Sequence, residues 1–181
     1  ISSSKIFSYA GQRIAVTIIS PELMEKRYSN LRKYFQTERV GHAFVHGGIY
    51  PTTAGVPQTA QHALAAFFES ANSGEYRFLD EVKIYAQRAE KIKKIFLRQD
   101  FKLVYDQDMG EPIGDGFYFT VTKSTMTGDE LLYKMLCNGM AGIPLSTTGS
   151  KKEGIRICVS LIRDDQMEEL ENRLIAFNAS L

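Results

Sequence analysis

The stretch "SSSKIFSYAGQRIA" at residues 2–15 places a lysine after three serines and shortly before a Gly-x-Arg step. A lysine amine is a nucleophile only in its neutral form, in which it condenses with carbonyl compounds to form Schiff bases. Arg13 carries a permanent positive charge, which disfavours a second charge on Lys5 and can bind a phosphate through paired hydrogen bonds. Serine hydroxyls and backbone amides can complete an anion-binding loop. These residue types therefore fit a ligand that carries both an aldehyde and a phosphate.

Three interpretations of this stretch stay open on residue types alone. Pyridoxal phosphate carries both of the required groups and forms a Schiff base with a protein lysine. The spacing Ser2-x-x-Lys5 also occurs in serine acyltransferases, with the serine as nucleophile. That motif expects companion motifs, and the cluster "STTGSKK" at residues 146–152 has the wrong order for one. The third interpretation is an exposed Ser-Lys loop ahead of a buried strand.

Taken as a whole motif, the stretch resembles the lysine signature of the class I and II aminotransferases, which are fold type I pyridoxal-phosphate enzymes. That signature is a small residue, a variable one, a small one and Lys, then Gly-x-Arg-aliphatic-small at fixed spacing. Ser3 and Tyr9 depart from it, because the family mostly has an apolar residue at their positions. The matching residues are Ser2, Ser4, Lys5, Ser8, Gly11, Arg13, Ile14 and Ala15.

A second segment supports the same resemblance. "AGIPLSTTGSKKEGIRICVSL" at residues 141–161 is similar to the closing segment of the family, which leads to an aliphatic-Arg-aliphatic strand centred here on Arg156. Taken alone, Arg156 fits equally well as an edge-strand arginine paired with an acid. Between the two segments, "GDGFYF" at residues 114–119 is similar to the Gly-small-aromatic strand of the family's small domain.

The resemblance implies a set of roles. Lys5 would bind the cofactor covalently and move a proton as general base and acid, while Ser2 and Arg13, with help from Ser4, would hold its phosphate. Arg156 would bind the α-carboxylate of the substrate. An aminotransferase acting on an amino acid and a 2-oxo acid is the first expectation. A lyase or synthase of the same fold shares both signatures, and a non-catalytic binding or dimerisation module is the third possibility.

The order of the motifs predicts which part of the fold the chain contains. In the family, the groups that contact the cofactor ring precede the lysine, whereas only four residues precede Lys5 here. The chain therefore resembles the C-terminal part of such an enzyme, with residues 1–74 as the remnant of the large cofactor-binding domain and residues 75–181 as the small domain. We expect no activity from this part alone and a homodimer for the intact protein.

Composition excludes several other classes. The 181 residues carry a net charge of +1, from 22 Lys and Arg against 21 Asp and Glu, which disfavours binding to nucleic acid or an anionic membrane. No apolar run approaches the roughly 20 residues that span a bilayer. Cys137 and Cys158 lie in apolar segments, which predicts buried free thiols and a reducing, cytoplasmic location. His42 and His46 have helical spacing, but no third ligand is evident, so no metal site is expected.

The hydrophobic pattern predicts the secondary structure. Ser20 and Pro21 form an N-terminal helix signal, and the apolar spacing between residues 75 and 99 is that of a long amphipathic helix. The class is predicted as α/β, with an α+β small domain. The expected helices are 21–35, 59–71, 75–99, 127–137 and 164–177; the expected strands are 13–20, 101–106, 116–122 and 154–162, with an extended piece at 142–146 and an irregular segment at 37–57.

Overall fold

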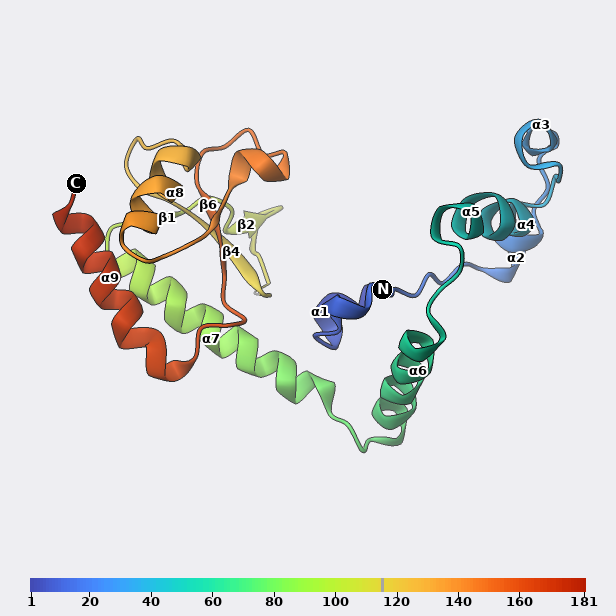
Figure 1. The fold of residues 1–181 in the computed structure, drawn as a ribbon, viewed down its shortest axis with the longest axis horizontal. Helices are drawn as coiled ribbons and strands as arrows, with labels where there is room; N and C mark the ends of the chain where they lie inside the picture. Colours follow the sequence, from blue (N-terminus) through green and yellow to red (C-terminus); the bar gives the residue numbers. More distant parts are fainter. Residues whose placement is uncertain (115) are drawn as a thin grey trace. The chain divides into compact units, whose positions relative to one another are not determined.

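The computed structural model describes residues 1–114 and 116–181, which form two compact units, Ile1–Phe78 and Leu79–Leu181 (Figure 1). The first unit is helical, and the second packs helices against a small antiparallel sheet. The mixed helix-and-sheet class predicted from the sequence is therefore confirmed. No helix in these residues combines the length and the apolar character needed to cross a bilayer.

The first unit consists of short helices and one longer helix. Its small core gathers Ile14, Ala60 and Leu64, which lie on the N-terminal segment and on the longer helix. The elements are α1 (Ser3–Ile6), α2 (Pro21–Glu25), α3 (Arg32–Phe35), α4 (Val40–His42), a π-helix (Ala43–Ile49), α5 (Tyr50–Thr53) and α6 (Gln58–Ser73), with 3-10 turns at Ala10–Gln12 and Ser29–Leu31.

The prediction of a strand at residues 13–20 is wrong. Only its beginning pairs, through a bridge between Ser2 and Ala15, and Ile18 is 78% exposed. A β-branched run is stable as a strand only where a neighbouring strand supplies hydrogen bonds and covers its side chains. Within the described part of the first unit, no strand lies beside residues 17–20.

The continuous helix predicted at residues 21–35 is broken after α2. Ser20 does cap α2, because its hydroxyl accepts a hydrogen bond from the Leu23 amide at 3.2 Å. Beyond α2 the backbone becomes extended and pairs with a later segment: the Tyr28 amide donates to Glu38 O and the Val40 amide donates to Lys26 O, both at 2.9 Å. Backbone pairing with this distant segment replaces the continuing helix.

The segment predicted to be irregular, residues 37–57, is mostly helical. Two of its glycines, Gly41 and Gly47, lie inside helical elements and allow close packing. A Cβ atom on Gly47 would lie 2.2 Å from Cδ1 of Phe35, so only glycine allows the π-helix to approach α3 this closely. The expectation of a loop, which rested on the glycine pattern, is therefore wrong.

The second unit is built on a four-stranded antiparallel sheet in the order β1-β4-β6-β5, within the residues described. Its core joins alternate strand residues, among them Val121 and Ile155, to buried side chains of α7, α8 and α9. The strands are β1 (Lys102–Leu103), β4 (Tyr118–Thr122), β5 (Ile143–Pro144) and β6 (Ile155–Cys158); the helices are α7 (Phe78–Arg98), α8 (Gly128–Cys137) and α9 (Met167–Ala179); a hairpin forms β2 (Gln107–Asp108) and β3 (Glu111–Pro112).

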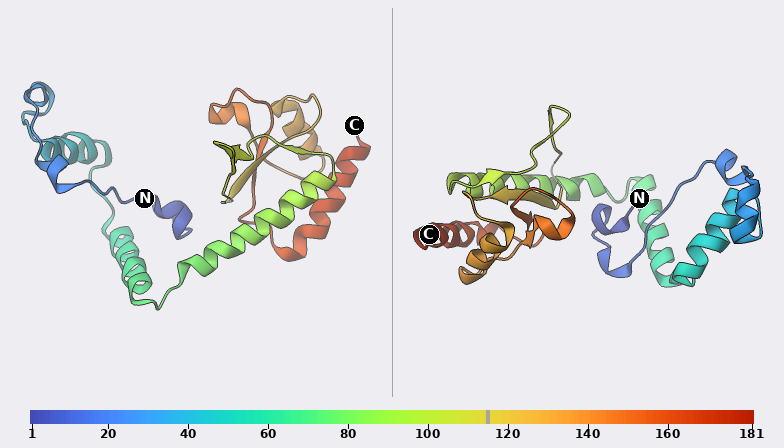
Figure 2. Two further views of the ribbon diagram at one scale, coloured as in Figure 1. Left: turned by 180° about the vertical axis from the view of Figure 1, so that it is seen from behind. Right: turned by 90° about the horizontal axis from the view of Figure 1, so that it is seen from above.

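Helix α9 runs beside α7 along the second unit (Figure 2). Arg98 on α7 makes a two-pronged hydrogen-bonded ion pair with Glu171 on α9, with both N···O distances at 2.9 Å. Only the second half of α7 is buried, beginning at Ala89, and Leu79 near its start is 60% exposed. The prediction of a long amphipathic helix is confirmed, and its buried face belongs to this unit's core.

Helix α8 begins with a capping box. The Thr127 hydroxyl accepts from the Glu130 amide at 3.3 Å, and the Thr127 amide and hydroxyl donate to Glu130 Oε2 at 2.9 and 3.0 Å. These hydrogen bonds, together with the positive charge of Lys134, lower the pKa of Glu130. The sequence predicted this helix start correctly at Thr127.

Both cysteines are free thiols, as expected, but the prediction that they are buried is wrong. On β6, Ile155 and Ile157 point into the core, so Cys158 lies on the opposite face of the strand. On α8 the buried residues are Gly128, Leu131 and Met135, and Cys137 is exposed at the end of the helix. An apolar neighbourhood in the sequence did not determine which face of the element each thiol occupies.

Candidate functional site

Residues 1–16 form a loop that is closed at its base. The Ile1 ammonium group donates to Val16 O at 2.7 Å, and the Val16 amide donates to Ile1 O at 2.9 Å. Ser2 and Ala15 form the next backbone bridge. The two ends of the lysine motif are therefore held side by side, and α1 lies inside the loop.

The loop is anchored by the two residues that depart from the aminotransferase pattern. Ser3 is 1% exposed, and its hydroxyl donates to the carbonyl of Ile14 across the loop. The Tyr9 ring packs against Phe67 of α6 with the ring centroids 5.8 Å apart, and Phe7 stacks on the same ring at 5.3 Å. A hydroxyl at position 3 thus satisfies a backbone carbonyl, which an apolar residue could not do.

The predicted phosphate-binding residues and Lys5 all lie on this loop. Lys5 is on α1 and exposed, Ser2 is exposed just before α1, and Ser4 is half-buried within it. Arg13 follows a 3-10 turn in the left-handed conformation, with φ at 52°, and its Nη1 donates to Ala10 O at 3.0 Å. One small loop therefore presents an amine, two hydroxyls and a guanidinium, which suits an anionic ligand with a carbonyl group.

Arg156 lies in the second unit, at the middle of its sheet. It is on β6, between β4 and β5, and is paired with Thr120 and Ile143 in the ladder. Its guanidinium makes no ion pair with any residue that the structure describes. The alternative of an edge-strand arginine paired with an acid therefore does not match its position.

Sequence reasoning missed the partner of Arg156. The guanidinium carbon of Arg156 lies 4.4 Å from the centroid of the Tyr118 ring on the neighbouring strand β4. Tyr118 is 37% exposed. The signal was the alternation along each strand: Phe119 and Ile157 are buried, so Tyr118 and Arg156 share the opposite face.

A glycine fixes the start of β6. Gly154 has a φ of +140°, and a Cβ there would lie 2.5 Å from the carbonyl oxygen of Val121 on β4. No other residue type fits this close approach, which sets the register that puts Arg156 opposite Thr120. The aromatic motif at residues 114–119 leads into β4, with its Asp115 outside the described residues.

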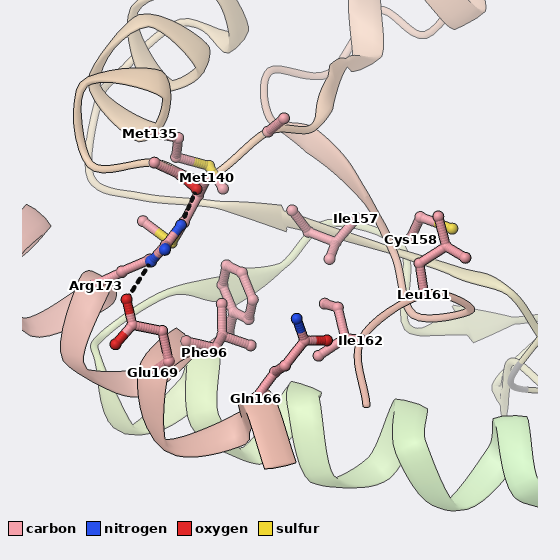
Figure 3. Close-up of a pocket in the computed structure, with 13 residues that line it drawn as sticks. Phe96, Met135, Met140, Ile157, Cys158, Leu161, Ile162, Gln166, Glu169 and Arg173 are labelled. Atoms are coloured by element: carbon pink, nitrogen blue, oxygen red, sulfur yellow. Dashed lines mark hydrogen bonds and ion pairs between the residues drawn. The ribbon is translucent and has the colours of Figure 1, made fainter. Parts of the chain in front are cut away.

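A cavity of about 380 Å³ lies in the second unit, and Ile157 and Cys158 of β6 are among the residues that line it (Figure 3). Its floor is apolar and includes Phe96 and Met140. At its rim Arg173 donates to Glu169 Oε1 at 2.8 Å and to the carbonyl of Gly139. At this rim Arg173 is thus paired with a carboxylate and a backbone carbonyl of the same unit.

Metal ligation has no support in the residues that the structure describes. The rings of His42 and His46 are neighbours, with centroids 4.6 Å apart, as their spacing suggests. Within residues 1–114 and 116–181, no three His, Cys, Asp or Glu side chains come together in a group that could hold a metal ion.

The fold of this chain is similar to that of solved aminotransferase structures. YbdL from Escherichia coli, described with a methionine aminotransferase function, matches with a TM-score of 0.55 and 19% identity, covering 74% of this chain and 34% of its own. LysN from Thermus thermophilus, an α-aminoadipate aminotransferase complexed with N-(5'-phosphopyridoxyl)-L-leucine, matches with a TM-score of 0.55 and 12% identity, covering 73% and 34%. The chain thus spans about a third of the length of these structures.

No protein-family model and no curated protein matches the chain. At the identities found, the two structures are similar to this chain in fold alone.

Proposed function

We propose that these residues are the C-terminal part of a pyridoxal-phosphate-dependent aminotransferase that acts on an amino acid and a 2-oxo acid. One observation carries the proposal: the signature residues Lys5 and Arg13 lie on a single closed loop, in a chain whose fold is similar to that of aminotransferases. Residues 1–74 would then be the remnant of the large domain and residues 75–181 the small domain.

The residues of the loop fit the cofactor. The exposed Lys5 amine can bind the aldehyde carbon, and the Arg13 guanidinium with the hydroxyls of Ser2 and Ser4 can hold the phosphate. Pyridoxal phosphate supplies an electron sink for the charge that develops at the substrate Cα. Lys5 Nζ would move the proton at that carbon as general base and acid.

Arg156 is proposed to bind the α-carboxylate of the substrate. A planar guanidinium holds a carboxylate through two parallel hydrogen bonds, which fixes the orientation of the Cα–H bond. The lack of an ion-pair partner for Arg156 among the described residues supports this role, because its charge is available to a ligand. As in the sequence-based expectation, the intact protein would be a cytoplasmic homodimer.

Two other functions share part of this support. A lyase or synthase of the same fold would use the same lysine and arginine, so the cofactor is better supported than the reaction. A non-catalytic binding or dimerisation module would need neither Lys5, Arg13 nor Arg156, and their joint presence disfavours it.

The proposal is tested by measuring transfer of an amino group from a panel of amino acids to 2-oxoglutarate, with the intact protein and added pyridoxal phosphate. We expect turnover by the intact protein, and a loss of roughly 10²- to 10⁴-fold or more in Lys5→Ala, because the proton-moving group is removed. Lys33→Ala, at an exposed lysine of the same unit, is the matched control.

Three other outcomes would each contradict a different part of the proposed function. Product formation that needs no 2-oxo acid would replace the aminotransferase with the lyase or synthase. Turnover by residues 1–181 alone would contradict the assignment of this chain as an incomplete part of the enzyme. Full activity in Lys5→Ala would remove the proposed role of the lysine.

A further inference from the structure

The face of the second unit's sheet that points away from the core carries Arg156, Tyr118, Thr120 and Cys158. Arg156 and Tyr118 lie on neighbouring strands, offset by two positions in the ladder, since Arg156 is opposite Thr120 and Cys158 is opposite Tyr118. This diagonal places the guanidinium carbon 4.4 Å from the ring centroid. At that distance the cation is within range of attraction by the aromatic face.

The Tyr118 ring is a close neighbour of the Arg156 guanidinium. Thr120 and Ile143, which flank Arg156 in the ladder, carry no charge, and no carboxylate of a described residue forms an ion pair with it. Burial of a charged side chain is costly, so a half-buried guanidinium on an inner strand gains from a neighbour that attracts it. An aromatic face does this, because it attracts the cation but carries no net charge.

Neighbouring aromatic side chains support the Tyr118 ring. The adjacent residue Phe117 packs edge-on against Tyr118, with centroids 6.4 Å apart, and against Tyr85 of α7 at 4.5 Å. The Val159 amide donates to Phe117 O at 2.9 Å, so β6 is also tied to this point of the chain. Phe117, which contacts the ring, is therefore held by a side chain of α7 and by a backbone hydrogen bond from the residue that follows β6.

We propose that Tyr118 is a positioning residue for carboxylate recognition by Arg156. Its ring covers one face of the guanidinium, so the N–H groups at the guanidinium edge remain to form two parallel hydrogen bonds with a planar carboxylate. This inference rests on the proposed function, because it requires Arg156 to be the ligand of the substrate carboxylate.

Steady-state kinetics of the intact protein with its amino donor test the inference. Tyr118→Leu removes the aromatic face and is expected to raise KM about three- to tenfold, with kcat changed less than twofold. Tyr118→Phe keeps the ring and should leave KM within about twofold of wild type. Tyr133→Leu, at a tyrosine of α8 that is 70% exposed, controls for loss of an aromatic side chain elsewhere in the unit.

Arg156→Lys separates failure of this inference from failure of the proposed function. If Arg156→Lys raises KM about tenfold or more while Tyr118→Leu leaves it unchanged, the carboxylate role of Arg156 stands and the positioning role of Tyr118 is overturned. If Arg156→Lys leaves KM unchanged, both roles are overturned. A Tyr118→Leu effect that falls on kcat alone also overturns the inference, because ground-state binding would then be intact.

Discussion

At the scale of single residues, Arg13 combines an unusual backbone conformation with a proposed ligand-binding role. It is a non-glycine residue with φ at 52° and ψ at 44°, in the left-handed region that most side chains avoid. The turn that holds it is closed by the Arg13 amide, which donates to Ala10 O at 3.4 Å. Arg13 thereby ends the 3-10 turn at Ala10–Gln12 as its C-cap.

Two substitutions of Arg13 distinguish the contribution of its guanidinium to cofactor affinity from that of its left-handed backbone conformation. In the intact protein, Arg13→Gln should weaken the affinity for pyridoxal phosphate by about ten- to a hundredfold, because a charge-assisted hydrogen bond to phosphate is lost. Arg13→Gly adopts the same φ without strain and should weaken affinity equally without loss of stability. Absorbance titration of the cofactor measures the affinity, and unchanged affinity in both variants would rule out the phosphate role.

Some contacts of single residues could not be predicted from the sequence. The hydrogen bond from Ser3 to Ile14 joins positions eleven residues apart, and no local pattern indicates it. The exposed side of Cys158 and Tyr118 could have been predicted from strand alternation, once Ile155 and Phe119 were assigned to the core. Chemistry-bearing residues were predicted from motif spacing, whereas their contacts were not.

At the scale of elements, the start of α8 depends on side-chain hydrogen bonds that respond to pH. The ionised Glu130 accepts two hydrogen bonds from Thr127, and its pKa is lowered accordingly. A carboxyl group with a lowered pKa stabilises the folded state above its unfolded pKa, near about 4.3, and this contribution is lost as the pH falls through its folded value.

Glu130→Gln should therefore change the acid dependence of stability. The wild-type chain is expected to exceed the variant in free energy of unfolding at pH 7, with the difference shrinking below about pH 4. Urea denaturation, followed by circular dichroism at pH 7 and below about pH 4, measures this difference in the free energy of unfolding. Glu168→Gln, at an exposed carboxylate in the first turn of α9, is the control and should show a smaller change. A difference that is the same at both pH values would contradict the capping account.

Helices α6, α7 and α8 and strands β4 and β6 were predicted close to their observed positions, and β4 and β6 each supply the partner strand that the other needs. Helices α6 and α7 follow from their own periodicity, and α8 follows from its capping box. The strand predicted at 13–20 failed because strand formation depends on a neighbour that the local sequence does not contain. The helices in residues 37–57 were missed because a glycine that permits close packing has the same sequence signal as one that ends a helix.

At the scale of the whole molecule, the candidate residues are divided between the two units. Lys5 and Arg13 belong to Ile1–Phe78, and Arg156 belongs to Leu79–Leu181. The motif resemblance predicts one function for these residues, and the chain is similar in fold to YbdL and LysN. Because the chain spans about a third of those structures, the activity is proposed for the intact protein.

Reductive trapping tests most directly whether Lys5 binds pyridoxal phosphate. The intact protein would be incubated with the cofactor, reduced with borohydride and digested, and the modified peptide identified by mass spectrometry. We predict a phosphopyridoxyl group on Lys5 that is lost in Lys5→Ala. A well-folded intact protein with Lys5 unmodified would contradict the assignment and favour a binding or dimerisation module.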